Sequence, residues 1–201
     1  MTVDGIELLK TPDYGALASA LIGDDSAPKD ASKAAELLDK GCDNGDMNCC
    51  GLLGSMYEHG MGVTMDLAHA AALLSQACAR EELLSCAVLG GYYTTGKGVA
   101  LDYAKAFELV SNACAGGEAM GCFNQAIMYD DGLGVALDDA KAAQLYAKAC
   151  DRGKGEACQN LGLMCEDGEG FPKDVARAKD LFRRACELGV SDSCRYLEQP
   201  H

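Results

Sequence analysis

The stretch Cys150-Asp-Arg-Gly-Lys-Gly-Glu-Ala-Cys158 decides the fold, because its cysteine, seven intervening residues and second cysteine recur five times along the chain. The first cysteines fall at positions 42, 78, 114, 150 and 186, a constant step of 36 residues. Such a period is typical of an array of structural repeats, each of which contacts its neighbours. The five pairs are Cys42 and Cys50, Cys78 and Cys86, Cys114 and Cys122, Cys150 and Cys158, and Cys186 and Cys194.

Each repeat unit has the pattern of two helices. Between Cys86 and Tyr93, apolar and small residues recur at the spacing of one helix face, which predicts a first helix of about ten residues. Between Ala106 and Ala113, apolar residues at i, i+3, i+4 and i+7 predict a second helix. A weaker copy of the unit begins at Tyr14. The sequence therefore predicts an all-α solenoid of about five helix pairs.

A Gly-x-Gly motif and an aspartate separate the two helices of a unit. A dinucleotide-binding loop would need a strand before the glycines, and the pattern contains none. We therefore interpret the glycines as the left-handed end of the first helix, and the aspartate as the N-cap of the second. The residues are Gly60 and Gly62 with Asp66, Gly96 and Gly98 with Asp102, Gly132 and Gly134 with Asp138, and Gly168 and Gly170 with Asp174.

The interval between the two cysteines of a pair is expected to be a seven-residue turn that joins consecutive repeats. Antiparallel helices on either side of this turn would bring the two cysteines opposite each other, which suits a disulfide. Zinc sites use closer cysteine spacings or paired histidines, and neither occurs here. Reduced cysteines that bind Cu(I) are the less favoured alternative. We expect five disulfides, and neither a metal nor another cofactor.

Two cysteines lie outside the pairs. Cys165 stands where three other units have tyrosine, so we expect a buried, inert thiol in the core. Cys49 precedes Cys50 directly, where the other units have serine, glycine or alanine. It is either a competitor of Cys50 for Cys42 or an exposed, reactive thiol.

The cysteine content also indicates the compartment. Twelve cysteines in 201 residues favour an oxidising environment such as the periplasm or the extracellular space. The segment Met1–Lys10 has neither a basic beginning nor a long apolar run, so we do not interpret it as a signal peptide. No stretch approaches the roughly 18–20 apolar residues of a membrane span.

The net charge of -14 restricts the kinds of partner. Nucleic acids and anionic lipid surfaces are bound through basic residues, so both are disfavoured. The charge permits a protein or peptide partner with basic groups, although it also serves solubility alone. We expect the chain to be a monomer.

The pattern L-G-x-x-Y-x-x-G-x-G-V, followed by D and K-A, resembles the Sel1-like repeat family, a relative of the tetratricopeptide repeats. The match covers residues 14–194, and the spacing of the cysteine pairs is similar to that of the Helicobacter cysteine-rich protein subgroup. In the unit that begins at Cys86, the residues that carry the pattern are Leu89-Gly90, Tyr93, Gly96, Gly98-Val99, Asp102 and Lys105-Ala106.

The resemblance implies a right-handed superhelical stack of antiparallel helix pairs linked by disulfides, and a function as adaptor or scaffold. For the cysteine-rich subgroup it also implies penicillin binding or weak β-lactamase activity. A mitochondrial assembly factor for cytochrome oxidase looks similar, which adds the intermembrane space to the candidate compartments. We predict an N-terminal cap at 1–13, a degenerate repeat at 14–49, repeats at 50–85, 86–121, 122–157 and 158–193, and a C-terminal cap at 194–201, all in one elongated domain.

Two functional alternatives to a scaffold remain at this point. A serine β-lactamase would use S-x-x-K with S-D-N and K-T-G. Ser26-Ala-Pro-Lys29 fits the first motif by letter, but its proline interrupts the helical turn and neither companion motif occurs. The other alternative is a redox-linked assembly factor that uses Cys49 or Cys165. No set of His, Asp and Ser residues indicates a catalytic site.

The face of each first helix that points away from the core varies between repeats, and it is the predicted partner-binding surface. In solenoids the inner helices line the concave side, where such variation is typical of recognition. This face has an apolar centre and an acidic edge. The alternative is that Leu52, Val88 and Leu163 pack between adjacent repeats. The predicted binding residues are Leu52, Ser55, Glu58, Val88, Thr94, Phe123, Ile127, Asp130, Gln159, Leu163 and Glu166.

Overall fold

The structure, a computed structural model, describes residues 13–22 and 30–198. These residues form eleven helices and no strand. The helices are α1 (Tyr14–Ile22), α2 (Ala31–Asp43), α3 (Met47–His59), α4 (Leu67–Cys78), α5 (Leu83–Thr95), α6 (Tyr103–Ala115), α7 (Ala119–Asp130), α8 (Asp139–Asp151), α9 (Gly155–Asp167), α10 (Val175–Glu187) and α11 (Ser191–Glu198).

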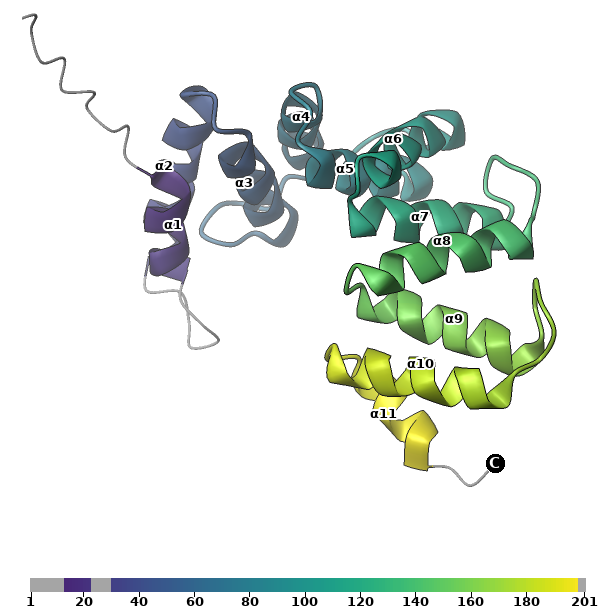
Figure 1. Ribbon diagram of the computed structural model, residues 1–201. Helices are drawn as coiled ribbons and strands as arrows, with labels where there is room; N and C mark the ends of the chain where they lie inside the picture. The colour runs from purple at the N-terminus through teal and green to yellow at the C-terminus, as the bar shows by residue number, and fades with distance from the viewer. Residues whose placement is uncertain (1–12, 23–29, 199–201) are drawn as a thin grey trace, which may run out of the picture.

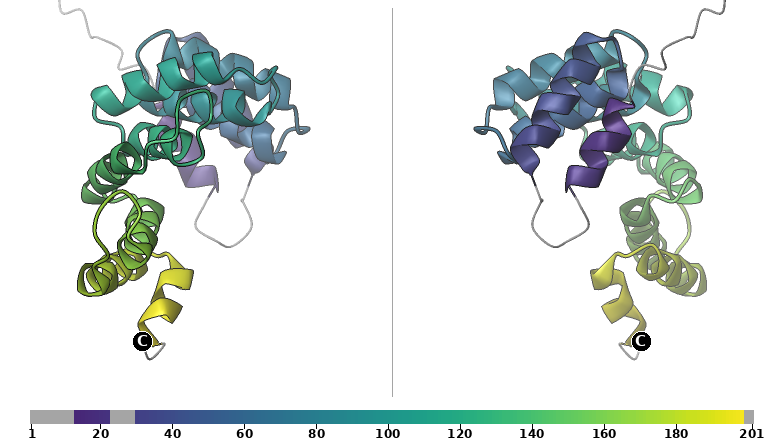
Figure 2. Two further views of the ribbon diagram at one scale, coloured as in Figure 1. Left: turned by 90° about the vertical axis from the view of Figure 1, so that its right-hand side faces the viewer. Right: turned by 90° about the vertical axis from the view of Figure 1, so that its left-hand side faces the viewer.

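The helices stack as pairs along a curved path. Figure 1 shows the chain passing from α1 and α2 through α4 to α6 and on to α9 to α11, with α1 and α11 at opposite ends. The two side views of Figure 2 show the same separation of the ends. Helices that follow each other in the chain make most of the contacts. The predicted all-α solenoid of helix pairs is confirmed.

The aspartates that precede the second helices cap them, as predicted. The Asp102 carboxylate accepts a hydrogen bond from the Lys105 backbone amide at 3.0 Å, and this satisfies one of the free amides of the first turn of α6. Asp66, Asp138 and Asp174 make the same bond at the starts of α4, α8 and α10.

The two glycines of each Gly-x-Gly motif have different roles. Gly96 ends α5 in the left-handed conformation, with φ of 72°, as predicted. Gly98 also has a positive φ, of 68°, and a Cβ atom there would collide with the carbonyl oxygen of Leu67, the first residue of α4. The second glycine therefore lets the loop approach the second helix of the preceding repeat, a contact between repeats that the sequence pattern did not reveal.

The turn between consecutive repeats is shorter than predicted. Helix α5 begins at Leu83, three residues before Cys86, so only residues 79–82 separate it from α4. Glu82 fixes this start, because its carboxylate accepts from the backbone amides of Leu84 and Ser85 at 3.2 and 2.6 Å. Asp46 and Glu118 cap α3 and α7 in the same way. The seven-residue turn and the ten-residue first helix were wrong predictions: acidic caps extend α3, α5 and α7 to 12 or 13 residues. Helix α9 is also 13 residues long, although its N-cap, Lys154, makes no capping side-chain bond.

All five predicted disulfides are present. Each joins the end of one second helix to the first turn of the next helix, with Cα atoms 4.4 to 4.9 Å apart. The bonded pairs are Cys42–Cys50, Cys78–Cys86, Cys114–Cys122, Cys150–Cys158 and Cys186–Cys194. Every junction between repeats is therefore covalently closed.

The ends of the stack are described only in part. Of the predicted N-terminal cap, residues 1–12 lie outside the described residues, and Asp13 caps α1 through the Ala16 amide at 2.8 Å. At the other end α11 begins at Ser191, three residues before the predicted capping segment. None of the described helices is long and apolar enough to cross a membrane.

Candidate partner-binding surface

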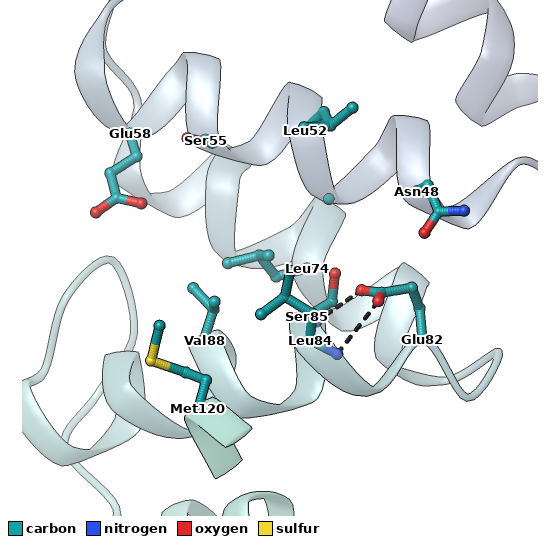
Figure 3. Close-up of a pocket in the computed structure, with 11 residues that line it drawn as sticks. Asn48, Leu52, Ser55, Glu58, Leu74, Glu82, Leu84, Ser85, Val88 and Met120 are labelled. Atoms are coloured by element: carbon teal, nitrogen blue, oxygen red, sulfur yellow. Dashed lines mark hydrogen bonds between the residues drawn. The ribbon is translucent and has the colours of Figure 1, made fainter. Parts of the chain in front are cut away.

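A groove of about 500 Å³ lies between α3 and α5 (Figure 3). It contains four of the predicted binding residues, namely Leu52, Ser55, Glu58 and Val88. The complete lining is Asn48, Gly51, Leu52, Ser55, Glu58, Leu74, Glu82, Leu84, Ser85, Val88 and Met120.

The centre of the groove is apolar. Leu52 and Leu84 stay 42% and 47% exposed, which is unusual for leucines that share one concave site. Leu74 from α4 and Met120 from α7 contribute to the lining, and Val88 lies between them in Figure 3. The groove therefore exposes a continuous apolar surface to solvent.

Glutamates stand at the two ends of the groove. Glu58, at the C-terminal end of α3, forms an ion pair with Lys97 from the following repeat. Burial alone would raise the pKa of Glu58, but the hydrogen bond from Lys97 and the charge of Lys97 outweigh it, and the pKa is lowered. At the other end Glu82 lies opposite Asn48 (Figure 3). In the part of the chain that the structure describes, no ion pair includes Glu82.

A buried hydroxyl also faces this groove. Ser85 is 1% exposed, and its Oγ has no hydrogen-bond partner among the described residues. A Cβ atom at Gly51 would lie only 2.8 Å from this oxygen, so the backbone of Gly51 already covers the hydroxyl closely.

The groove exists because the gap between these two first helices is not filled. Between α5 and α7, Asn124 donates from its side-chain amide to the Ala87 carbonyl at 2.9 Å, and the helices pack together. The same positions 36 residues earlier are Val88 and Gly51. Valine has no side-chain donor, so this hydrogen bond is not made between α5 and α3.

The next gap, between α7 and α9, differs from the groove by an aromatic ring. Phe123 lies in the same repeat position as Gly51, and its ring centroid is 5.8 Å from that of Tyr146 in α8. The Lys154 ammonium lies 5.3 Å above the Phe123 ring and covers it. Among these three first-helix gaps, the helices therefore pack together only between α5 and α7, and a ring stands in the gap between α7 and α9.

The other predicted binding residues lie outside the groove. Phe123, Ile127 and Leu163 are half-buried against the core of the last repeats. Thr94 donates its hydroxyl hydrogen to the Gly90 carbonyl at 2.9 Å within α5. Gln159 and Glu166 are half-buried on α9.

Asp130 is the remaining predicted binding residue, and Tyr146 holds it. The Tyr146 hydroxyl donates to the Asp130 carboxylate at 2.9 Å. Burial, together with the nearby carboxylates of Asp131 and Asp139, raises the pKa of Asp130, although the hydrogen bond from Tyr146 opposes this. The side chain therefore belongs to a contact between α7 and α8 and lies outside the groove.

Comparison with known proteins identifies the repeats. Five successive segments match the sequence model of the Sel1 repeat, at residues 16–46, 49–81, 83–118, 119–154 and 155–190. The chain belongs to the Sel1 repeat family. A search among curated proteins gave no match.

Solved structures of Sel1 repeat proteins have the same fold. A protective antigen of uropathogenic Escherichia coli is 29% identical over 92% of this chain, with a TM-score of 0.75, and this chain spans 39% of the antigen's length. A Sel1 repeat protein from Oxalobacter formigenes matches 94% of this chain and 78% of its own, at 23% identity and a TM-score of 0.82. Helicobacter pylori cysteine-rich protein B is 32% identical over 66% of this chain and 96% of its own, with a TM-score of 0.55.

At the start of the second Sel1 segment, Cys49 is free and fully buried, so the interpretation as an exposed thiol was wrong. Burial and a hydrogen bond with Asp46 raise the pKa of Cys49 to about 12. Its Sγ lies 2.5 Å from the position that a Cβ of Gly41 would occupy. The other repeats have alanine at that position, so Gly41 provides the space for the larger Cys49 side chain.

In the fifth Sel1 segment, Cys165 is free and fully buried. The preceding repeats have tyrosine here, and in two of them a lysine covers the ring, as Lys105 covers Tyr93 with its Nζ 4.5 Å from the centroid. In this repeat Phe171 replaces the usual valine, and Arg177 lies 5.3 Å above the Phe171 ring instead. Burial raises the pKa of Cys165.

The enzymatic and redox alternatives gain no support from the described residues. Ser26 and Lys29 lie outside them. Within residues 13–22 and 30–198, no three His, Cys, Asp or Glu side chains come together in a group that would hold a metal ion. Both free thiols are buried, whereas redox-active cysteines are accessible and have lowered pKa values.

Proposed function

We propose that this Sel1 repeat protein is a non-enzymatic scaffold whose concave first-helix face holds a protein or peptide partner. Sel1 repeats are generally protein-interaction modules. The observation that carries the proposal is the groove between α3 and α5, which exposes Leu52 and Leu84, whereas α5 and α7 pack together. Concave apolar surfaces with a few polar groups are typical of binding sites.

The distribution of charge supports a basic partner. The chain carries 31 acidic and 17 basic residues. Three carboxylates, those of Asp46, Glu82 and Glu118, cap the first helices at the same repeat position and border the face on one side. They would attract basic groups and repel acidic ones. Five disulfides support an oxidising extracytoplasmic setting for this interaction.

Site-specific photo-crosslinking in the source cells tests the proposal. A benzoylphenylalanine residue replaces Leu52 in the groove, or Leu101 in the α5–α6 loop as the control, since Leu101 is 54% exposed and does not line the groove. We expect one reproducible crosslinked protein from position 52 and none from position 101. No crosslink at position 52, or the same protein from both positions, would overturn the assignment of this surface.

A further inference from the structure

The geometry points to one class of occupant for the groove: we propose a short extended peptide that inserts an aliphatic side chain between Leu52 and Leu84 and places a lysine or arginine beside Glu82. The inference rests on the proposed function, and it adds the chemistry and the direction of the bound segment.

The apolar part of the peptide follows from the exposed leucines. Leu52 and Leu84 lie on opposite sides of the groove and are both more than 40% exposed. An aliphatic side chain between them would remove both leucines from water. A space of about 500 Å³ holds a few side chains, so a short segment is enough to fill it.

The backbone of the peptide follows from the polar groups on α3. The side chains of Asn48 and Ser55 line the groove and offer an amide and a hydroxyl to the amide and carbonyl groups of an extended peptide. A purely apolar ligand would use neither of these polar groups.

The direction of the peptide follows from the two glutamates. Glu58 already pairs with Lys97, whereas Glu82 takes part in no ion pair of the described residues. The Glu82 carboxylate accepts hydrogen bonds from two backbone amides of its own helix, and a carboxylate has further acceptor positions for a partner. A cation of the partner is therefore expected at the Glu82 end.

Selection of peptides against the purified, oxidised protein tests this inference. A phage-displayed library of random peptides of about twelve residues is selected on the wild type. We expect enriched sequences that carry an aliphatic residue within a few positions of a lysine or arginine. The consensus peptide is then synthesised with a fluorescent label, and its affinity is measured by anisotropy.

Variants that copy the filled gaps of the chain provide the decisive comparison. Gly51→Phe introduces the ring that Phe123 provides, and Val88→Asn introduces the donor that Asn124 provides. We expect each to weaken binding of the consensus peptide by at least about tenfold. Leu137→Asn, at an exposed loop position outside the groove, is the control and keeps wild-type affinity. Thermal unfolding of each variant verifies that it is folded.

A milder variant tests the charge contact without filling the groove. Glu82→Gln keeps an acceptor for the helix cap but removes the charge, so we expect weaker binding and a smaller dependence of the affinity on salt.

The inference is overturned if no peptide is enriched, if the enriched peptides lack the aliphatic and basic pair, or if Gly51→Phe binds the consensus peptide like the wild type. A protein crosslinked from position 52 in spite of such a result would leave the scaffold function in place and remove only this class of partner. Peptide binding without any crosslinked protein would support this class of occupant and contradict the proposed scaffold function.

Discussion

Cys49 and Gly41 act as a matched pair inside one repeat. A glycine replaces the alanine of the other repeats where the Cys49 sulfur comes closest, so the larger side chain fits without displacing the helices. Cys165 and Phe171 make a similar exchange in a later repeat, where a tyrosine is lost and a phenylalanine is gained. Each pair changes two neighbouring side chains and preserves the packing of the core.

The unusual position of Cys49 could be recognised from the sequence, but its burial could not. A helix that begins at Cys50 leaves Cys49 in an exposed turn. The structure begins α3 at Met47, because Asp46 caps it, and this start turns Cys49 inward. An error of three residues in a helix boundary therefore reversed the environment of one side chain. Cys165 was easier to place, since its position lies in the middle of a helix.

Both free thiols are expected to be unreactive in the native protein. A thiol with a pKa of about 12, such as Cys49, is almost entirely protonated at neutral pH, and only the thiolate reacts with alkylating agents. At about pH 8 we expect native Cys49 and Cys165 to react with iodoacetamide at less than ~1% of the rate in denaturant. Mass spectrometry of the alkylated chain measures this. Rapid native labelling of either cysteine would contradict the prediction.

At the scale of the elements, the loop after each first helix connects neighbouring repeats. Its first glycine follows from the helix pattern alone, because a left-handed residue ends the helix. Its second glycine depends on a helix of the preceding repeat, as Gly98 depends on Leu67. Reading a single unit therefore finds the turn but misses the contact that sets the distance between units.

The two glycines of one loop should differ in their tolerance of alanine. Gly96→Ala forces a left-handed alanine, which costs about 1–2 kcal/mol of unfolding free energy, while its Cβ would meet no atom closer than 3.7 Å. Gly98→Ala adds a collision with the backbone of Leu67, so we expect it to cost about 1–3 kcal/mol more. Urea unfolding of the two variants measures the difference. Equal losses would show that the close approach of the repeats is unimportant for stability.

The candidate groove was only partly predictable, because it too depends on contacts between different repeats. The variable face of the first helices contained Leu52, Ser55, Glu58 and Val88, all of which line the groove. Whether a gap is open depends on pairs in different repeats, such as Asn124 with Ala87, and the pattern of one helix does not show them. Leu84 and Glu82 were missed because they were assigned to the turn.

At the scale of the whole molecule, the constant period was enough to predict the solenoid. A helix pair of this length cannot bury its apolar faces alone, so regular repetition implies stacking. The cysteine spacing added the covalent junctions, since each pair falls where two repeats meet. The sequence did not predict which first helices pack together and which leave a gap, because this depends on a few substitutions in otherwise regular repeats.

Reduction of the disulfides is expected to unfold the chain. Closing a loop of about nine residues contributes roughly 2.6 kcal/mol on the chain-entropy model, so five contribute about 13 kcal/mol. This is comparable with the whole stability of a typical domain, about 5–15 kcal/mol. We expect a reductant to lower the thermal midpoint of the helical circular dichroism signal by more than about 20 °C, with recovery on reoxidation. A reduced chain that melts like the oxidised one would contradict this.

The position of the disulfides also determines how the molecule would respond to a mechanical load. Each bond encloses one junction and eight steps of backbone, and none spans the loop inside a repeat. If the two ends of the chain were pulled apart, the helix pairs would open and extend. The disulfide at each junction would keep about 28 Å of backbone contour length from extending. Five junctions withhold about 140 Å in total. The protein would therefore lengthen as a series of tethered segments in which the order of the repeats is preserved.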